Sequence, residues 1–163
     1  MVRLGSSLRC CALLLLTGCA TTPAGGVWVR PDGTPGTQKC SKEARTAMSY
    51  LRMFVGEGGW ALLDANQTAG PITLHDGPIE SVLEDDLGLL ESPTRLYGYV
   101  WTGGPAAIVR YYEAQPMNGA PKVPICAVAR LLQGQLRKRL ESKPGTAILD
   151  SEGAGVFIVD EFR

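Results

Sequence analysis

The pattern of hydrophobic and polar residues changes from a helical period to a strand period part-way along the chain. Between residues 40 and 51, hydrophobic residues recur at spacings of three and four, which is typical of an amphipathic helix. Ser41 is a suitable N-cap with the acidic Glu43 in the first turn, and the GEGG stretch at 56–59 predicts the end of the helix. One amphipathic helix is therefore expected near the N-terminus.

From residue 60 onward, hydrophobic residues alternate with polar ones in short segments separated mostly by Gly, Pro, Asn or Asp. Evenly spaced short strands favour an antiparallel β-sandwich or barrel over alternating strands and helices. The expected fold class is therefore mainly β. The expected strands lie at 60–64, 72–75, 79–84, 94–101, 106–114, 123–131, 145–150 and 155–162.

Three further segments carry local predictions. Residues 27–30 suit a short strand that ends at the turn-forming PDGTPG of 31–36. The DSEGAG stretch at 150–155 predicts a hairpin loop between the last two strands. Residues 131–141 fit either state, because their leucines have helical spacing while Gly134 weakens a helix.

The first 18 residues have the features of a secretory signal. Arg3 and Arg9 lie before a short apolar run at 10–16, and small residues then lead to Cys19. The run is well short of the roughly 20 residues that span a bilayer as a helix. A cleaved signal at 1–18 is therefore expected.

Leu16-Thr17-Gly18-Cys19 resembles the lipobox of bacterial lipoproteins. The resemblance implies that Cys19 receives diacylglycerol on sulfur and, after cleavage, a fatty acyl chain such as palmitate on its new amino group. Ala20 is not the aspartate associated with inner-membrane retention, so the resemblance favours the outer membrane, facing the periplasm. The alternatives are a cleaved signal with an incidental cysteine and a cytosolic domain with an apolar start.

The rest of the chain divides into a linker and one domain. Residues 19–26, rich in Thr, Pro and Gly, indicate a flexible tether, and residues 27–163 are long enough for a single β-rich domain. The 163-residue chain has 16 basic and 16 acidic residues. This balance gives no indication of a nucleic-acid partner.

The cysteine count favours one disulfide. Of five cysteines, Cys10 and Cys11 lie in the expected signal and Cys19 in the lipobox, which leaves Cys40 and Cys126. An even pair in an oxidising compartment is expected to form a bridge, worth up to roughly 4–5 kcal/mol in the chain-entropy model. The alternative is two separate buried thiols.

The sequence offers little for catalysis or metal binding. His75 is the only histidine, so a zinc site would lack its usual companions, and a hydrolase would depend on His75 and Asp76. A structural hydrogen bond is the favoured role for His75, which lies beside Asp76 at a strand-to-turn junction. The acidic residues 84–86 lack the spacing of a calcium loop and indicate a solvated turn. No cofactor or metal is expected.

Aromatic residues alternate along one expected strand. Tyr97, Tyr99 and Trp101 share a face with Arg95, so the rings face outward if the aliphatic side forms the core. Exposed rings would suit a sugar or peptide, and this stripe is the possible ligand surface; packed aromatics are the favoured alternative. The basic residues 137–139 indicate a solvated turn, with anionic headgroups as the alternative contact.

Much of the mature chain resembles a group of uncharacterised small lipoproteins of myxobacterial type, some of them loosely labelled serine/threonine kinases. The resemblance implies a lipoprotein without a catalytic motif, and the chain lacks the HRD and DFG motifs of a kinase. The segments that carry it are VRPDGTPG, LHDGPIESVLE, LYGYVWTGGP, YYEAQP, VPICAVARL and PGTAIL.

These observations predict a membrane-anchored envelope lipoprotein with a β-rich binding or structural domain. Its expected partners are the membrane, through the lipid at Cys19, and an envelope protein or glycan. The alternatives are a hydrolase that uses His75 and Asp76, and an accessory partner of an envelope signalling system.

Overall fold

The computed structural model describes residues 26–132 and 134–163, which form a mainly β domain with one short helix. The predicted fold class is confirmed. In chain order the elements are β1 (Gln38–Lys39), α1 (Lys42–Tyr50), β2 (Gly58–Leu62), β3 (Ile72–His75), β4 (Gly77–Leu83), β5 (Thr94–Trp101), β6 (Ala106–Pro116), β7 (Val123–Arg130), β8 (Leu136–Arg137), β9 (Thr146–Leu149), β10 (Gly153–Ile158) and β11 (Glu161–Phe162).

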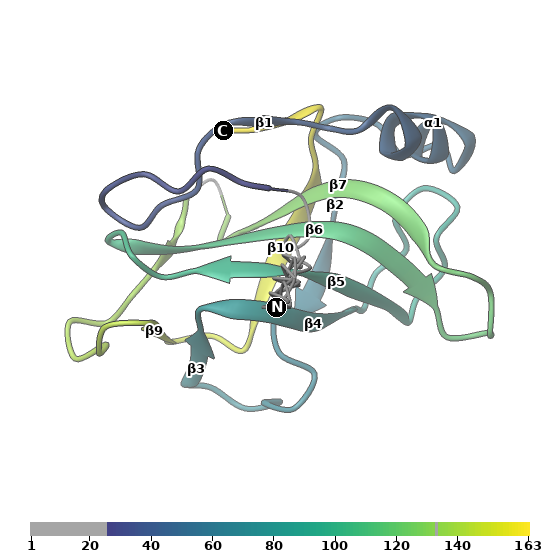
Figure 1. Cartoon of the computed structure of the whole chain (residues 1–163). Coiled ribbons are helices and arrows are strands. Elements are labelled where there is room, and N and C mark those ends of the chain that lie inside the picture. Colours follow the sequence, from purple (N-terminus) through teal and green to yellow (C-terminus); the bar gives the residue numbers. More distant parts are fainter. Residues whose placement is uncertain (1–25, 133) are drawn as a thin grey trace, which may run out of the picture.

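Six of these strands close into an antiparallel barrel (Figure 1). Its order is β5-β4-β2-β10-β7-β6, and β6 then pairs with β5 to complete the circle. Closure gives every barrel strand two neighbours, so the barrel has no open edge for another chain to pair with. Of the two predicted architectures, the chain adopts the barrel.

Alternate residues of the barrel strands face inward and fill it. Most are aliphatic, but Ser81 and Tyr111 are buried there too. The Ser81 hydroxyl donates to the Leu63 carbonyl oxygen at 2.5 Å, and the Tyr111 hydroxyl lies 2.7 Å from Ser81 Oγ. Since Ser81 has one hydroxyl hydrogen, Tyr111 is the donor of the second bond. The other inward residues include Ala61, Leu83, Leu96, Val100, Val109, Ile125, Ala129, Ala154, Val156 and Ile158.

Closure between β5 and β6 depends on Gly98. The register of this pair shifts between Tyr97 and Gly98, which marks a bulge. A Cβ atom built at Gly98 would overlap the Arg110 carbonyl oxygen. No residue with a side chain therefore fits while the backbones of β5 and β6 keep this separation. Glycine at a bulge is a common way to bring two strands together at a barrel corner.

The helix α1 packs on the outer face of β7. Ser41 caps it, since Ser41 Oγ accepts from the Ala44 amide at 3.0 Å. Met48 faces the barrel, and its sulfur accepts from the Cys126 amide at 3.3 Å. Cys40 and Cys126 lie at disulfide distance with their Cα atoms 5.9 Å apart, so the segment before α1 is joined to β7 as the cysteine count predicts.

Short strand pairs flank the barrel. β1 pairs with β11, which places the C-terminus beside the segment that leads to α1 (Figure 1). β3 pairs with β9 on the other side of the barrel, and β8 pairs with the start of β6.

Three local predictions are wrong. Residues 27–30 form no strand, only a single bridge between Val29 and Pro35. The helix ends at Tyr50 rather than at 56–59, because the chain turns at Arg52, with φ of 55°, and then buries Met53.

The hairpin predicted at 150–155 is also absent, because β9 pairs with β3 whereas β10 pairs with β2 and β7. Residues 131–141 contain no helix among their described residues. A bridge between Leu131 and Gly134 and the strand β8 occur there instead.

No helix in the described part of the chain is long and apolar enough to cross a membrane.

The first prediction concerns the hydroxyl pair inside the barrel. Tyr111→Phe removes the donor to Ser81 from a site without solvent, and we expect the free energy of unfolding to fall by about 1–2 kcal/mol. Tyr112→Phe is the matched control, because the half-buried Tyr112 donates to Gln38 at 3.1 Å near the surface. Urea denaturation of both variants measures the difference. An equal or larger loss in Tyr112→Phe would contradict the role given to the interior pair.

Candidate functional site

The aromatic stripe lies on the outer face of β5. Leu96 and Val100 point into the barrel, whereas Tyr97, Tyr99 and Trp101 alternate with them and point outward. The Tyr99 and Trp101 rings contact each other, with centroids 4.7 Å apart. The three rings therefore share one face, but their surroundings differ along the strand.

Trp101 belongs to a second, buried layer outside the barrel. Its neighbour Arg110 is fully buried, and the guanidinium carbon lies 5.4 Å from the Trp101 ring centroid and 5.1 Å from that of Phe162. Arg110 Nη2 donates to the Gly36 carbonyl oxygen at 2.9 Å, which holds the N-terminal segment over β6. With only 8% of its surface exposed, Trp101 is not available to a ligand.

Arg110 is held mainly by aromatic rings and not by a counter-ion. Among the described residues, its Nε and Nη1 atoms have no hydrogen-bond partner. Burial lowers the pKa of Arg110 from its ordinary value, because the charged form loses hydration. The contacts with Trp101 and Phe162 offset part of this cost through cation–π attraction.

Tyr97, by contrast, lines a surface hollow of about 360 Å³ together with Arg95, Gln115 and Met117. The Lys122 ammonium nitrogen lies 3.7 Å from the Tyr97 ring centroid and also pairs with Glu113 at 3.3 Å. One face of this ring is therefore already covered by a cation. The ligand surface predicted from the sequence is reduced to the half-buried Tyr97 and Tyr99.

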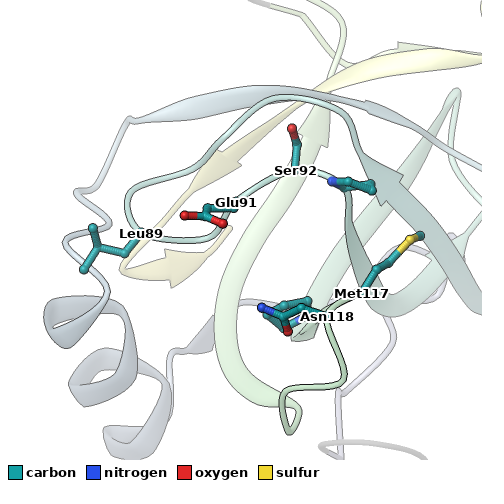
Figure 2. A pocket seen from close by; sticks show the side chains of 7 residues that line it. Leu89, Glu91, Ser92, Met117 and Asn118 are labelled. Carbon is teal, nitrogen blue, oxygen red and sulfur yellow. The ribbon is translucent and has the colours of Figure 1, made fainter.

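A second hollow, of about 330 Å³, adjoins the turn between β6 and β7 at one end of the barrel. Figure 2 shows it between the loop that carries Leu89, Glu91 and Ser92 and the turn that carries Met117 and Asn118. It offers exposed apolar surface from Leu89 and Met117 beside the carboxylate of Glu91. Such a lining suits a small apolar group with a polar edge.

Further exposed apolar side chains lie at the end of α1 and in the segment that follows it. The loop that carries Leu89 is fixed to the end of α1, because the Leu89 amide donates to the Leu51 carbonyl oxygen at 2.7 Å. We call this surface the apolar end of the barrel. Its exposed members are Tyr50, Phe54, Val55, Leu89 and Met117.

His75 and Asp76 do not form a catalytic pair with a cleft. Both residues are exposed, and Asp76 Oδ1 accepts from the Thr102 amide at 2.5 Å, which ties the start of β4 to the end of β5. Neither residue lines the two hollows described above. Asp76 thus makes a structural hydrogen bond, whereas the side chain of His75, for which the sequence favoured one, forms none with the other described residues.

The charged runs also have structural roles. Asp85 accepts from the Trp60 amide at 2.8 Å, and Asp86 accepts from the Ser92 amide at 2.7 Å, so these carboxylates fix loops. In the basic run, Lys138 donates to the Thr102 carbonyl oxygen, and Arg139 pairs with Asp150. Across residues 26–132 and 134–163, no group of three or more His, Cys, Asp and Glu side chains is placed to hold a metal ion.

The lipidation site predicted at Cys19 lies outside the described residues, as do the expected signal and most of the tether. Comparisons with protein-family models, curated proteins and solved structures found no match to this chain.

Sequence reasoning missed Arg110, which organises the layer outside the barrel. The sequence did contain a signal, because Arg110 lies in the middle of an expected strand and the neighbouring Tyr111 and Tyr112 give it unusually apolar surroundings. Arginine is seldom fully buried, so its position in this expected strand indicated exposure instead. The missing information was that residues 32–36 fold back over this strand.

The second prediction tests this layer. Arg110→Met keeps most of the packing but removes the donor to Gly36, so we expect the backbone amides of residues 28–36 to exchange about tenfold faster. The free energy of global unfolding should change by less than about 2 kcal/mol, since an incompletely paired buried charge is removed as well. Hydrogen exchange with mass spectrometry measures the first effect, and urea denaturation the second.

Arg95→Met is the matched control, because Arg95 lies on the same face of the neighbouring strand but pairs with Glu80 in solvent. It should leave exchange of residues 28–36 unchanged. Unchanged exchange in Arg110→Met would show that other contacts hold the segment.

Proposed function

We propose that this protein is a lipid-anchored envelope lipoprotein whose β-barrel is a binding or structural module, attached by Cys19 to the outer membrane and facing the periplasm. The lipobox-like residues 16–19 supply the anchor, and residues 20–26 link it to the domain. Several buried acyl chains give essentially permanent attachment, whereas a single chain gives only marginal binding.

The observation that carries this proposal is the pairing of Cys40 with Cys126 at disulfide distance. Disulfides persist mainly in oxidising compartments such as the bacterial periplasm. Once the signal and the lipobox account for Cys10, Cys11 and Cys19, these two are the cysteines that remain. The structure of the domain and the signal at the N-terminus thus favour the same compartment.

A binding role is supported by the shape and chemistry of the apolar end of the barrel. Leu89 and Met117 are about half exposed at the rim of a hollow of about 330 Å³. Phe54 and Val55 are exposed in the segment after α1, and the loop of Leu89 is hydrogen-bonded to the end of that helix. Exposed apolar groups gathered at one end of a small domain are typical of interaction surfaces. An envelope protein or a glycan with an apolar face is the partner that fits this lining.

The third prediction tests the anchor. In cells fed a labelled fatty acid, the wild-type protein should carry the label and sediment with outer membranes. Cys19→Ala should lose the label and accumulate as the unprocessed precursor, because lipidation requires the thiol of Cys19. Cys10→Ala is the matched control, since it removes a thiol from the expected signal without touching the lipobox, and should behave like the wild type. A wild-type protein without label contradicts the anchor.

The fourth prediction tests the compartment. Protein purified from envelopes in the presence of an alkylating reagent should show a Cys40–Cys126 cross-linked peptide in non-reducing mass spectrometry. The double variant Cys40→Ser, Cys126→Ser should lose up to roughly 4–5 kcal/mol of unfolding free energy, the upper figure for a loop of this length. Alkylated Cys40 and Cys126 in the wild-type sample would contradict a periplasmic location.

A further inference from the structure

Trp28 is held on the surface at the beginning of the described chain. Its side chain is 68% exposed, more than either of the other two tryptophans. The Gly36 amide donates to the Trp28 carbonyl oxygen at 2.7 Å, and the indole lies so close over Gly36 that an added Cβ atom would be 2.6 Å from it. The ring is therefore supported by backbone and still presents most of its surface to solvent.

The loop that carries Trp28 is internally braced. The Arg30 amide donates to the Thr34 carbonyl oxygen at 2.8 Å, and Arg30 Nη1 donates to the Pro35 carbonyl oxygen at 2.9 Å. At the base of this loop, Gly36 accepts from the buried Arg110. Trp28 is thus fixed relative to the barrel, although it lies only two residues after the first described residue.

The length of the upstream chain limits how far Trp28 can be from the anchor. Nine peptide bonds separate Cys19 from Trp28. A chain spans at most about 3.3–3.6 Å per residue, so the Cα atom of Trp28 lies within roughly 30 Å of that of the anchored cysteine. If Cys19 is acylated, the ring is within reach of the headgroup layer at all times.

An exposed tryptophan suits that layer better than water. Indole has a large apolar body and one N–H donor, and tryptophan is enriched where hydrocarbon meets headgroups. The tether also makes the contact intramolecular, so that even a weak affinity is well populated. Val29, which is 45% exposed beside Trp28, adds a small apolar area.

We propose that Trp28 inserts into the interface of the phospholipid bilayer that holds Cys19 and so sets how the barrel sits on the membrane. This inference rests on the proposed lipid anchor. The acyl chains supply the attachment, and the indole supplies a second point of contact that restricts rotation of the domain about its tether. The braced loop at 28–36 transmits this restriction to the barrel through Gly36 and Arg110.

The fifth prediction tests this contact by tryptophan fluorescence. The mature protein purified from membranes is reconstituted into vesicles of phosphatidylethanolamine and phosphatidylglycerol, with or without phosphatidylcholine brominated near the carbonyl end of its acyl chains. The brominated lipid should quench the wild-type emission. Trp28→Phe should lose at least half of that quenching.

Trp60→Phe is the matched control, because Trp60 is 40% exposed on the outer face of β2, and it should keep the wild-type quenching. Equal quenching in Trp28→Phe and the wild type would overturn the inference. So would a Trp28 emission that depends on protein concentration in detergent, which would place the ring against a second copy of the chain.

Mass spectrometry of the same samples separates the two proposals. An acylated Cys19 without Trp28 quenching overturns the membrane contact alone and leaves the anchor intact. A wild-type protein without acyl chains overturns the anchor and this inference together.

Discussion

The structure depends on the close approach of β5 and β6 at Gly98. Without this approach the six strands would form an open sheet with two unpaired edges, and the interior would lose one wall. Gly98 makes it possible because the Arg110 carbonyl oxygen occupies the space that a side chain would need. The bulge beside Gly98 also shifts the outward residues, and it brings Tyr99 opposite Arg110 on the outer face.

A closed barrel of this size is filled by its own side chains, and this directs function to the outside. In the interior Tyr111 donates to Ser81, which donates to the Leu63 carbonyl oxygen, and burial raises the pKa of Tyr111 well above its usual range. Surfaces open to a partner include the apolar end, the outer face of β5 and the N-terminal loop. The N-terminal loop and the segment before α1 form an outer layer over the barrel.

That outer layer is joined to the barrel at two independent places. The Cys40–Cys126 pair joins the segment before α1 to β7, and Arg110 joins Gly36 to β6. Both attachments lie within fourteen residues of Gly26, where the described chain begins after the expected tether. A force applied through a lipid anchor would therefore reach two neighbouring strands of the closed sheet rather than a fraying terminus.

The sequence predicted the local structure well and the long-range structure poorly. Alternation and turn residues located all eight strands of four or more residues, and Ser41 marked the start of the helix, because these signals depend on immediate neighbours. The hairpin at 150–155 was wrong because strands adjacent in sequence were assumed to pair, whereas β9 and β10 have partners far along the chain.

In the candidate site, too, local features were predicted from the sequence and long-range contacts were not. The alternation of Tyr97, Tyr99 and Trp101 predicted their common face, but which rings meet solvent depends on what folds over them. Trp101 is covered because residues 32–36 return to Arg110, and this contact spans 74 residues of sequence. The spacing of residues within one strand carries no information about a contact over this distance in sequence. No periodic pattern marks Trp28 either, because its exposure depends on the braced loop that holds its ring at the surface.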